Sequence, residues 1–166
     1  SVNEQPLGLR VEFPTLSQLM SMNNQKTDKI TILFLCTGNS CRSQIVEAWA
    51  KQLRASEIEA YSAGIKKHGL NPYAVKVMDE VGIDISEQFS KTIEELPLSE
   101  FDWVITLCGH ANETCPYFPG RRIHHGFDDP PQLTEDLWTE EEKRIPYRRV
   151  RDEIRQFIES LPHSLK

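Results

Sequence analysis

The sequence predicts a single α/β domain, doubly wound around a central four-stranded parallel sheet that is flanked by helices. Short runs of apolar and β-branched residues alternate along the chain with segments whose apolar residues recur at helical spacing. Strands and helices that alternate in this way typically build a parallel sheet. The 166 residues suffice for one domain with a sizeable core and are too few for two domains of ordinary size.

Four segments are predicted to be strands. The first is a continuous apolar run that ends at a cysteine, and the fourth has the weakest pattern. The predicted strands are residues 30–35, 58–62, 101–107 and 122–127. Ligands of open α/β sheets bind at the carboxyl ends of the strands, so we expect the functional site there.

Apolar residues at helical spacing predict three longer helices, and a short helix is expected over residues 90–96. The first ends near Ala55, the second begins with Asn71 as its N-cap and ends at Gly82, and the last begins at about Pro146. The predicted buried faces consist of Ile45, Val46, Trp49, Ala50 and Leu53; of Ala74, Val77, Met78 and Val81; and of Val150, Ile154, Phe157, Ile158 and Leu161.

Two segments are predicted to lie outside this core. Residues 1–29 carry no strong period, and we interpret them as an N-terminal extension, partly disordered, ahead of a domain formed by residues 30–166. The charged stretch 130–144 contains the acidic run Glu140–Glu142 and is predicted to be a solvated surface excursion.

Composition excludes several classes of function. The net charge of −6 argues against nucleic acid or an anionic membrane as a general partner, since both select basic surfaces. The sequence contains no run of about 18 apolar residues and no apolar segment behind a basic N-terminus, so neither a membrane span nor a secretory signal is visible. We therefore expect a cytoplasmic monomer.

The loop after the first predicted strand is the predicted functional site. It comprises Cys36, Thr37, Gly38, Asn39, Ser40, Cys41, Arg42 and Ser43. In a strand–loop–helix unit, the loop N–H groups and the positive end of the helix converge on one spot, which suits a tetrahedral oxyanion. Arg42 adds a guanidinium that can hold two of the anion's oxygens. The same groups favour a thiolate, so Cys36 is predicted to be a nucleophile, and Cys41 a loop residue without a redox role.

A second pair of cysteines follows the third predicted strand. If the first and third strands are neighbours, Cys36 and Cys108 lie on the same rim of the sheet. A disulfide requires Cα atoms within roughly 7 Å, so the Cys108 segment must move inward, and Gly109 gives it freedom to do so. A bond from Cys108 to Cys115 would require unwinding of any helix between them. Two alternatives are a pair of inert core thiols and a zinc site, which the cysteine spacings fit poorly.

A carboxylate is predicted on the same rim. Asp128-Asp129-Pro130 follows the fourth predicted strand. Phosphoryl-type chemistry with a thiolate needs a general acid for the leaving oxygen, and we choose Asp129 because Pro130 fixes it. The alternative is an ordinary surface turn. The five histidines show no ligand or triad spacing and are assigned no chemistry, and no metal or cofactor is expected.

The spacing Cys-x5-Arg-Ser directly after a strand resembles the phosphate loop of the low-molecular-weight protein tyrosine phosphatases. With the Cys108/Cys115 pair and residues 126–130, the chain is similar to the thioredoxin-coupled arsenate reductases that share this phosphatase fold. The likeness covers residues 30 to about 161 and is broken by an extra stretch at 133–144.

The resemblance implies a mechanism. Arg42 and the N–H groups of residues 37–42 would bind arsenate, with phosphate or sulfate as competing anions. Cys36, hydrogen-bonded by Ser43, would attack arsenic while Asp129 protonates the departing oxygen. Cys108 would then attack Cys36, releasing arsenite.

The implied cycle ends outside the oxyanion loop. Cys115 would attack Cys108, and thioredoxin would reduce the Cys108–Cys115 disulfide.

One alternative is a low-molecular-weight tyrosine phosphatase, in which aromatic residues follow the Asp-Pro pair, whereas this chain has Pro131-Gln132-Leu133. The other is a non-enzymatic oxyanion or arsenite sensor, although no basic DNA-reading element is apparent.

A departure from the family concerns potassium. Some of these reductases hold the ion near the loop with an Asn, a Glu, a Ser and an Asp. Asn39, Glu47 and Ser62 match the first three, but Lys91 occupies the place of the Asp. An ammonium repels a cation, so our hypothesis is that Lys91 replaces the ion, its ammonium hydrogen-bonding near Glu47 and the loop to hold Asn39 in place. The alternative is an exposed lysine on a short helix.

Overall fold

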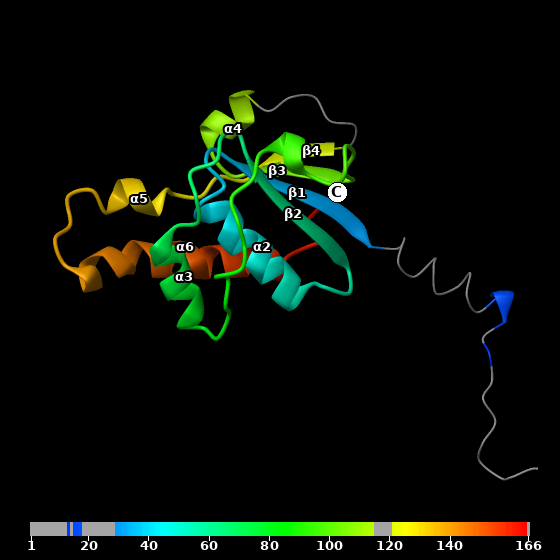
Figure 1. Cartoon of the computed structure of the whole chain (residues 1–166), viewed down its shortest axis with the longest axis horizontal. Coiled ribbons are helices and arrows are strands. Elements are labelled where there is room, and N and C mark those ends of the chain that lie inside the picture. Colours follow the sequence, from blue (N-terminus) through cyan, green and yellow to red (C-terminus); the bar gives the residue numbers. More distant parts are fainter. Residues whose placement is uncertain (1–12, 14, 18–28, 115–120, 166) are drawn as a thin grey trace, which may run out of the picture.

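The computed structural model describes residues 13, 15–17, 29–114 and 121–165. Its centre is a four-stranded sheet in the order β2-β1-β3-β4, in which every pair is parallel (Figure 1). The strands are β1 (Ile30–Cys36), β2 (Ile58–Gly64), β3 (Trp103–Thr106) and β4 (Arg121–His124). This topology confirms the predicted fold class, and each strand lies within three residues of its predicted bounds.

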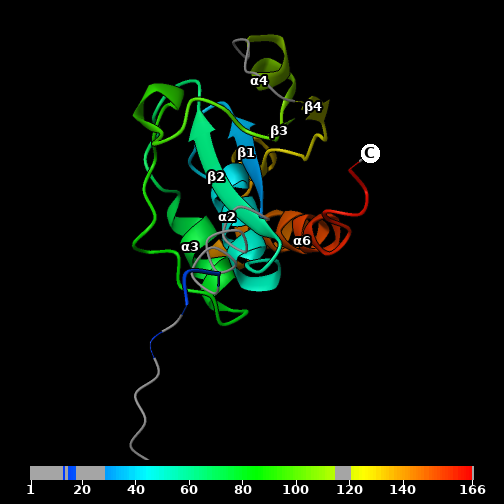
Figure 2. The same cartoon turned by 90° about the vertical axis from the view of Figure 1, so that its right-hand side faces the viewer.

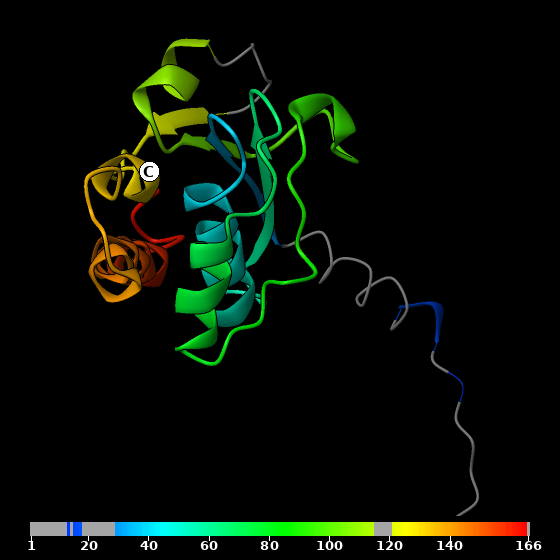
Figure 3. The same ribbon diagram turned by 60° about the vertical axis from the view of Figure 1, so that its left-hand side comes forward.

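The helices cover the sheet unevenly. They are α2 (Arg42–Leu53), α3 (Pro72–Asp79), the 3-10 helix η1 (Ile93–Glu95), α4 (Gly109–Thr114), α5 (Pro130–Leu133) and α6 (Glu140–Glu159). Helices α2, α3 and α6 lie together on one side of the sheet (Figure 3). The segment before η1 extends the β2 edge, because Thr92 forms a parallel bridge with Gly64.

Strand β1 is central because it is apolar on both faces. Residues 32–35 are fully buried, as expected for a parallel strand covered from both sides. The pairing places Leu35 beside Thr106, and the Leu107 N–H donates to the Leu35 carbonyl at 2.8 Å. Cys36 and Cys108 therefore follow adjacent strand ends, near the end of the sheet where α4 lies (Figure 2).

Helix α3 begins as predicted. The Asn71 side chain accepts hydrogen bonds from the N–H groups of Tyr73 and Ala74, and Pro72 occupies the first helical position, where no N–H is needed. The predicted buried face is wrong at one residue. Val81 lies beyond the helix end at Asp79 and is 36% exposed.

Helix α6 starts six residues before its predicted beginning at Pro146, so the acidic run is not a surface excursion. Thr139 and Glu142 form a capping box, and three glutamates occupy the first turn, where the helix dipole favours negative charge. Pro146 lies inside the helix. The surface excursion is therefore limited to the connection between α5 and α6.

The short helix predicted over residues 90–96 is also corrected. Only the 3-10 turn of η1 forms. Ser90 and Lys91 lie outside it and hydrogen-bond to the loop at 36–43 instead. The predicted extension at residues 1–29 lies almost wholly outside the described residues. Among the residues described, no helix combines the length and apolar character that a membrane span requires.

Candidate active site

The loop between β1 and α2 lines a cavity of about 360 Å³. Besides this loop, the β2–α3 connection and the start of α5 contribute to the walls. The lining residues are Cys36, Thr37, Gly38, Ser40, Cys41, Arg42, His68, Asn71, Asp129 and Pro131. Five of the six predicted anion-binding residues at 37–42 thus line one cavity together with the predicted nucleophile and acid.

The sixth residue, Asn39, supports the loop from beneath. Its φ of 49° lies in the left-handed region, which Asn tolerates better than most residues. Its side-chain amide donates to Ser43 Oγ at 2.7 Å and to Ser62 Oγ at 3.1 Å. Its carbonyl oxygen accepts from the Lys91 N–H at 2.9 Å and from Gln44 Nε2 at 3.1 Å. This buried residue therefore fixes the turn to α2, β2 and the segment before η1.

The end of β2 approaches this loop closely. A Cβ on Gly64 would lie 2.8 Å from the Asn39 nitrogen, so only glycine fits without a shift of backbone. The next residues bond to the loop through their backbone: the Lys66 N–H donates to Thr37 and the His68 N–H to Gly38. The cradle is therefore rigidly attached to the sheet.

Cys36 sits at the base of the cavity with 3% of its surface exposed. Its sulfur lies 2.8 Å from Ser43 Oγ, and Ser43 in turn accepts from Asn39. Because Ser43 Oγ accepts that bond, its own proton is free to point at the sulfur. The Ser43 hydroxyl thus orients the Cys36 sulfur within the cavity.

Arg42 connects the loop to the segment after β4. One guanidinium nitrogen donates to the Phe127 carbonyl at 3.1 Å, and another lies 3.6 Å from an Asp129 oxygen. Asp128 is exposed and pairs with Arg149 on α6 instead. The geometry therefore favours Asp129 over Asp128 as the carboxylate at the anion cavity.

Cys108 lies beside the same site, 9% exposed, just before α4. The Thr37 hydroxyl is 3.1 Å from its sulfur, and the Ala111 N–H donates to the sulfur at 3.4 Å. A second cavity of about 440 Å³ adjoins Cys108 and shares Arg42 and Asp129 with the first. Cys36, Cys41 and Cys108 are all free thiols. Cys115 lies outside the described residues.

Cys41 differs from the other two cysteines. Burial raises the pKa of its thiol far above the ordinary value, and the nearby charges of Cys36 and Asp129 raise it further. Since only a thiolate is an effective nucleophile, this shift makes Cys41 a poorer nucleophile than an exposed thiol.

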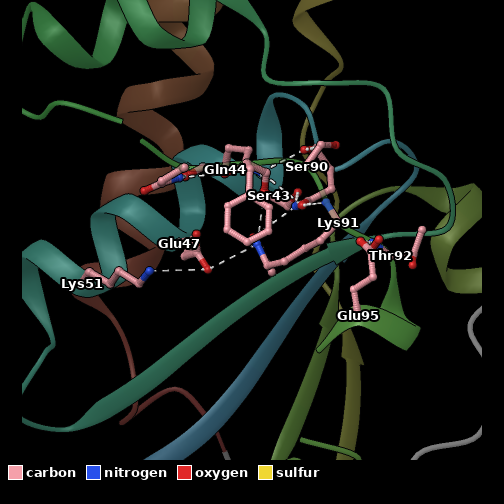
Figure 4. A network of polar contacts seen from close by, with 12 residues as sticks. Ser43, Gln44, Glu47, Lys51, Ser90, Lys91, Thr92 and Glu95 are labelled. Carbon is pink, nitrogen blue, oxygen red and sulfur yellow. Dashed lines mark hydrogen bonds and ion pairs between the residues drawn. The ribbon is translucent and has the colours of Figure 1, made fainter. Parts of the chain in front are cut away.

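Lys91 extends toward Glu47, one of the three residues that match the potassium ligands (Figure 4). Its ammonium donates to Ser62 Oγ at 3.3 Å and lies 3.9 Å from Glu47, while its backbone N–H holds Asn39. Burial lowers the pKa of Lys91, and Glu47 opposes that shift. The side chain is 12% exposed, so the alternative of an exposed surface lysine is wrong.

Two features of the site were missed from the sequence. His68 lines the anion cavity, although its position in the chain shows no ligand spacing. Thr37 is predicted to bind the anion through its backbone N–H, and its hydroxyl also contacts Cys108. Knowledge of the strand order would have indicated the second contact. In the described ranges, no three His, Cys, Asp or Glu side chains converge as a metal site requires.

Comparisons with known proteins agree with this geometry. The family model of low molecular weight phosphotyrosine protein phosphatases matches residues 31–166. An arsenate reductase of Halalkalibacterium halodurans is 52% identical over 141 residues, covering 84% of this chain and 99% of that protein. A solved arsenate reductase in a phosphate-binding state superposes with a TM-score of 0.63 at 31% identity, covering 82% of this chain and 99% of the other.

A second solved structure is a thioredoxin-dependent arsenate reductase of Corynebacterium glutamicum. It has a TM-score of 0.58 at 25% identity and covers 87% of this chain and 67% of that one. The matched model and these relatives span the sheet, the oxyanion loop and the Cys108 segment. The chain therefore belongs to the low-molecular-weight phosphatase family and, within it, to the arsenate reductases.

Proposed function

We propose that the protein reduces arsenate to arsenite with electrons from its own cysteines. The observation that carries this proposal is the contact between Thr37, the neighbour of Cys36, and the sulfur of Cys108. A hydrolytic phosphatase needs one thiolate in an oxyanion cradle. A second thiol held against that cradle supplies what a reduction needs, which is a group that can attack the first sulfur.

The first step forms an arsenic–sulfur bond. Arsenate binds to the loop N–H groups and Arg42, and the Cys36 thiolate attacks arsenic. Asp129 gives its proton to the departing oxygen, which leaves as water. Ser43 holds the thiolate in place before the attack. Cradle donors that face the developing charge stabilise this transition state electrostatically.

The second step is the reduction. The Cys108 thiolate attacks the Cys36 sulfur, a disulfide forms, and the electron pair of the arsenic–sulfur bond passes to arsenic. Arsenic(V) thereby becomes arsenic(III), and arsenite leaves. Because α4 begins at Gly109, the Cys108 sulfur can advance by adjustment of the first turn of that short helix.

The third step regenerates Cys36. Cys115 attacks Cys108, and the resulting Cys108–Cys115 disulfide is reduced by an external dithiol, for which we propose thioredoxin. The support for this step is the resemblance in sequence and the thioredoxin dependence of the C. glutamicum relative. Inorganic phosphate, which a solved relative binds, is proposed as a competing ligand.

The test is a coupled assay. With thioredoxin, thioredoxin reductase and NADPH, we expect NADPH oxidation that depends on arsenate and yields one arsenite per NADPH. The same preparation is assayed with an aryl phosphate. Release of phosphate from the aryl phosphate at a rate typical of phosphatases, without arsenate-dependent NADPH oxidation, would show that the protein is a phosphatase.

A further inference from the structure

His68 is held directly over the oxyanion loop. Its backbone N–H donates to the Gly38 carbonyl at 3.0 Å. Its ring lies so close above Gly38 that a Cβ added to this glycine would be 2.2 Å from His68 Nδ1 and 2.6 Å from Cγ. The imidazole therefore occupies the space that a side chain at Gly38 would fill, at the wall of the anion cavity.

The ring has hydrogen-bonding capacity that the fold does not use. Neither ring nitrogen forms a hydrogen bond or ion pair with any other residue in the described part of the chain. An imidazole always carries at least one N–H, whichever tautomer is present. This donor belongs to a residue that lines the same cavity as Arg42 and the loop residues Thr37, Gly38 and Ser40.

A tetrahedral anion bound in the cradle has one oxygen that the cradle does not hold. Three oxygens of a tetrahedral anion can lie in the cradle, while the fourth points outward, opposite the attacking thiolate. In inorganic arsenate or phosphate this oxygen is free to accept hydrogen bonds. In a phosphoester it carries an organic group and loses most of that capacity. A donor at the mouth of the cavity thus distinguishes the two classes of ligand.

We propose that His68 is a substrate-binding residue that donates a hydrogen bond to the outward oxygen, and that it sets a preference for free inorganic oxyanions over esters. The proposal rests on the proposed function only in that the cradle binds a tetrahedral anion. Asp129, from the segment after β4, and His68, from the β2–α3 connection, then contact the same outward oxygen from two different loops.

Two ligands of matched shape test this role. Phosphate and methylphosphonate are both tetrahedral anions with three cradle oxygens, but methylphosphonate has a methyl group in place of the fourth. Their dissociation constants are measured by titration calorimetry with wild-type protein, His68→Ala and His68→Phe. Because calorimetry needs no turnover, the result is independent of whether the protein reduces arsenate.

We expect both substitutions to weaken phosphate binding about three- to tenfold, the loss of one hydrogen bond of ordinary net strength. Methylphosphonate binding should change less than twofold. His68→Phe keeps a ring above Gly38 without the donor, so it separates donation from packing. Lys66→Ala removes an exposed charge from the same loop outside the cavity and should leave both constants unchanged.

Three results would overturn the proposal. Equal weakening of both ligands would show that His68 only supports the loop. Retained phosphate affinity in His68→Phe would show that the ring packs and does not donate. A loss in Lys66→Ala as large as that in His68→Ala would show that the effect is one of general charge.

Discussion

The hydroxyl of Thr37 lies 3.1 Å from the sulfur of Cys108, although 71 residues separate them in the chain. Thr37 follows the end of β1 and Cys108 follows β3, so the contact exists because these two strands are neighbours in the sheet. Through this contact, Thr37 holds the sulfur of Cys108, which is proposed to attack the neighbouring Cys36.

Thr37→Val should slow the reduction step and spare anion binding. The substitution keeps the backbone N–H of the cradle but removes the hydrogen bond to Cys108. We expect disulfide formation in a single turnover to slow about tenfold, the size of one hydrogen bond to a charged sulfur. Quench-flow measurement of arsenite release checks this, with phosphate affinity measured in parallel. Thr37→Ser is the control and should keep a near wild-type rate.

The cysteines should act in a fixed order. Cys36→Ser removes the nucleophile and should abolish all chemistry. Cys108→Ser should stop reduction while leaving any phosphatase activity of Cys36. Cys115→Ser should allow about one turnover and then accumulate a Cys36–Cys108 disulfide. Peptide mapping of the trapped species checks the pairing. Continuous thioredoxin-driven turnover by Cys115→Ser would remove Cys115 from the scheme.

Asp129→Asn should slow formation of the arsenic–sulfur bond by roughly 10²–10⁴, because the amide cannot give a proton to the leaving oxygen. Phosphate affinity should be retained. The matched control is Asp128→Asn, since Asp128 pairs with Arg149 at the surface. Pre-steady-state kinetics compare the two variants. A larger rate loss in Asp128→Asn would mean that the acid is the other carboxylate.

The activity should not respond to potassium. Lys91 already places a positive charge near Glu47 and Ser62, so we expect equal rates in potassium and in a bulky organic cation at fixed ionic strength. Lys91→Asp removes this charge and adds a carboxylate, so this variant should become potassium-dependent. A several-fold stimulation of the wild-type enzyme by potassium would contradict the hypothesis.

The cluster around Glu80 should contribute to stability except in acid. Glu80 accepts hydrogen bonds from Arg144, Arg148 and Arg151, three residues of α6. Chiefly because of the Arg148 bond, its pKa is lowered from 4.5 to about 2. A lowered carboxyl pKa means that the unfolded state binds the proton more tightly, so the stabilisation is complete above about pH 4.5 and disappears toward pH 2.

Glu80→Gln should therefore lower the free energy of unfolding by about 1 kcal/mol at pH 7. Urea titrations at several pH values measure the difference, which should shrink steadily below about pH 4.5. Glu100→Gln, at an exposed position before β3, is the control and should show no such pH dependence. A difference that stays constant down to pH 2 would mean that the ion pairs are not its source.

The core of the fold and the oxyanion loop could be predicted because their signals are local. Residues 30–35 are uniformly apolar, and the loop sequence after them leaves few alternatives. The error at α6 has a physical cause. Pro146 is typical of a helix start, but a proline within the helix is tolerated here because the capping box at Thr139 and the packing of the later turns hold the helix on both sides.

Contacts between distant segments were harder to foresee. The resemblance to the family places Lys91 near Asn39, but the hydrogen bond from the Lys91 backbone to the Asn39 side chain depends on how the segment before η1 runs along β2. The sequence around His68 shows no motif or spacing that indicates a functional role. Such residues gain their role from the strand order, which the sequence alone indicates only in outline.

Because the side chain of Asn39 is fully engaged with Ser43, Ser62, Gln44 and the Lys91 backbone, the cradle exists before any anion enters it. A preformed cradle selects an anion by its charge and its tetrahedral shape. Arsenate and phosphate are nearly alike in both properties. Equilibrium binding alone therefore gives the protein little means to choose between them. In the proposed cycle the choice is made by reactivity: thiols reduce arsenic(V) to arsenic(III) but do not reduce phosphorus(V), so phosphate competes for the site without being reduced.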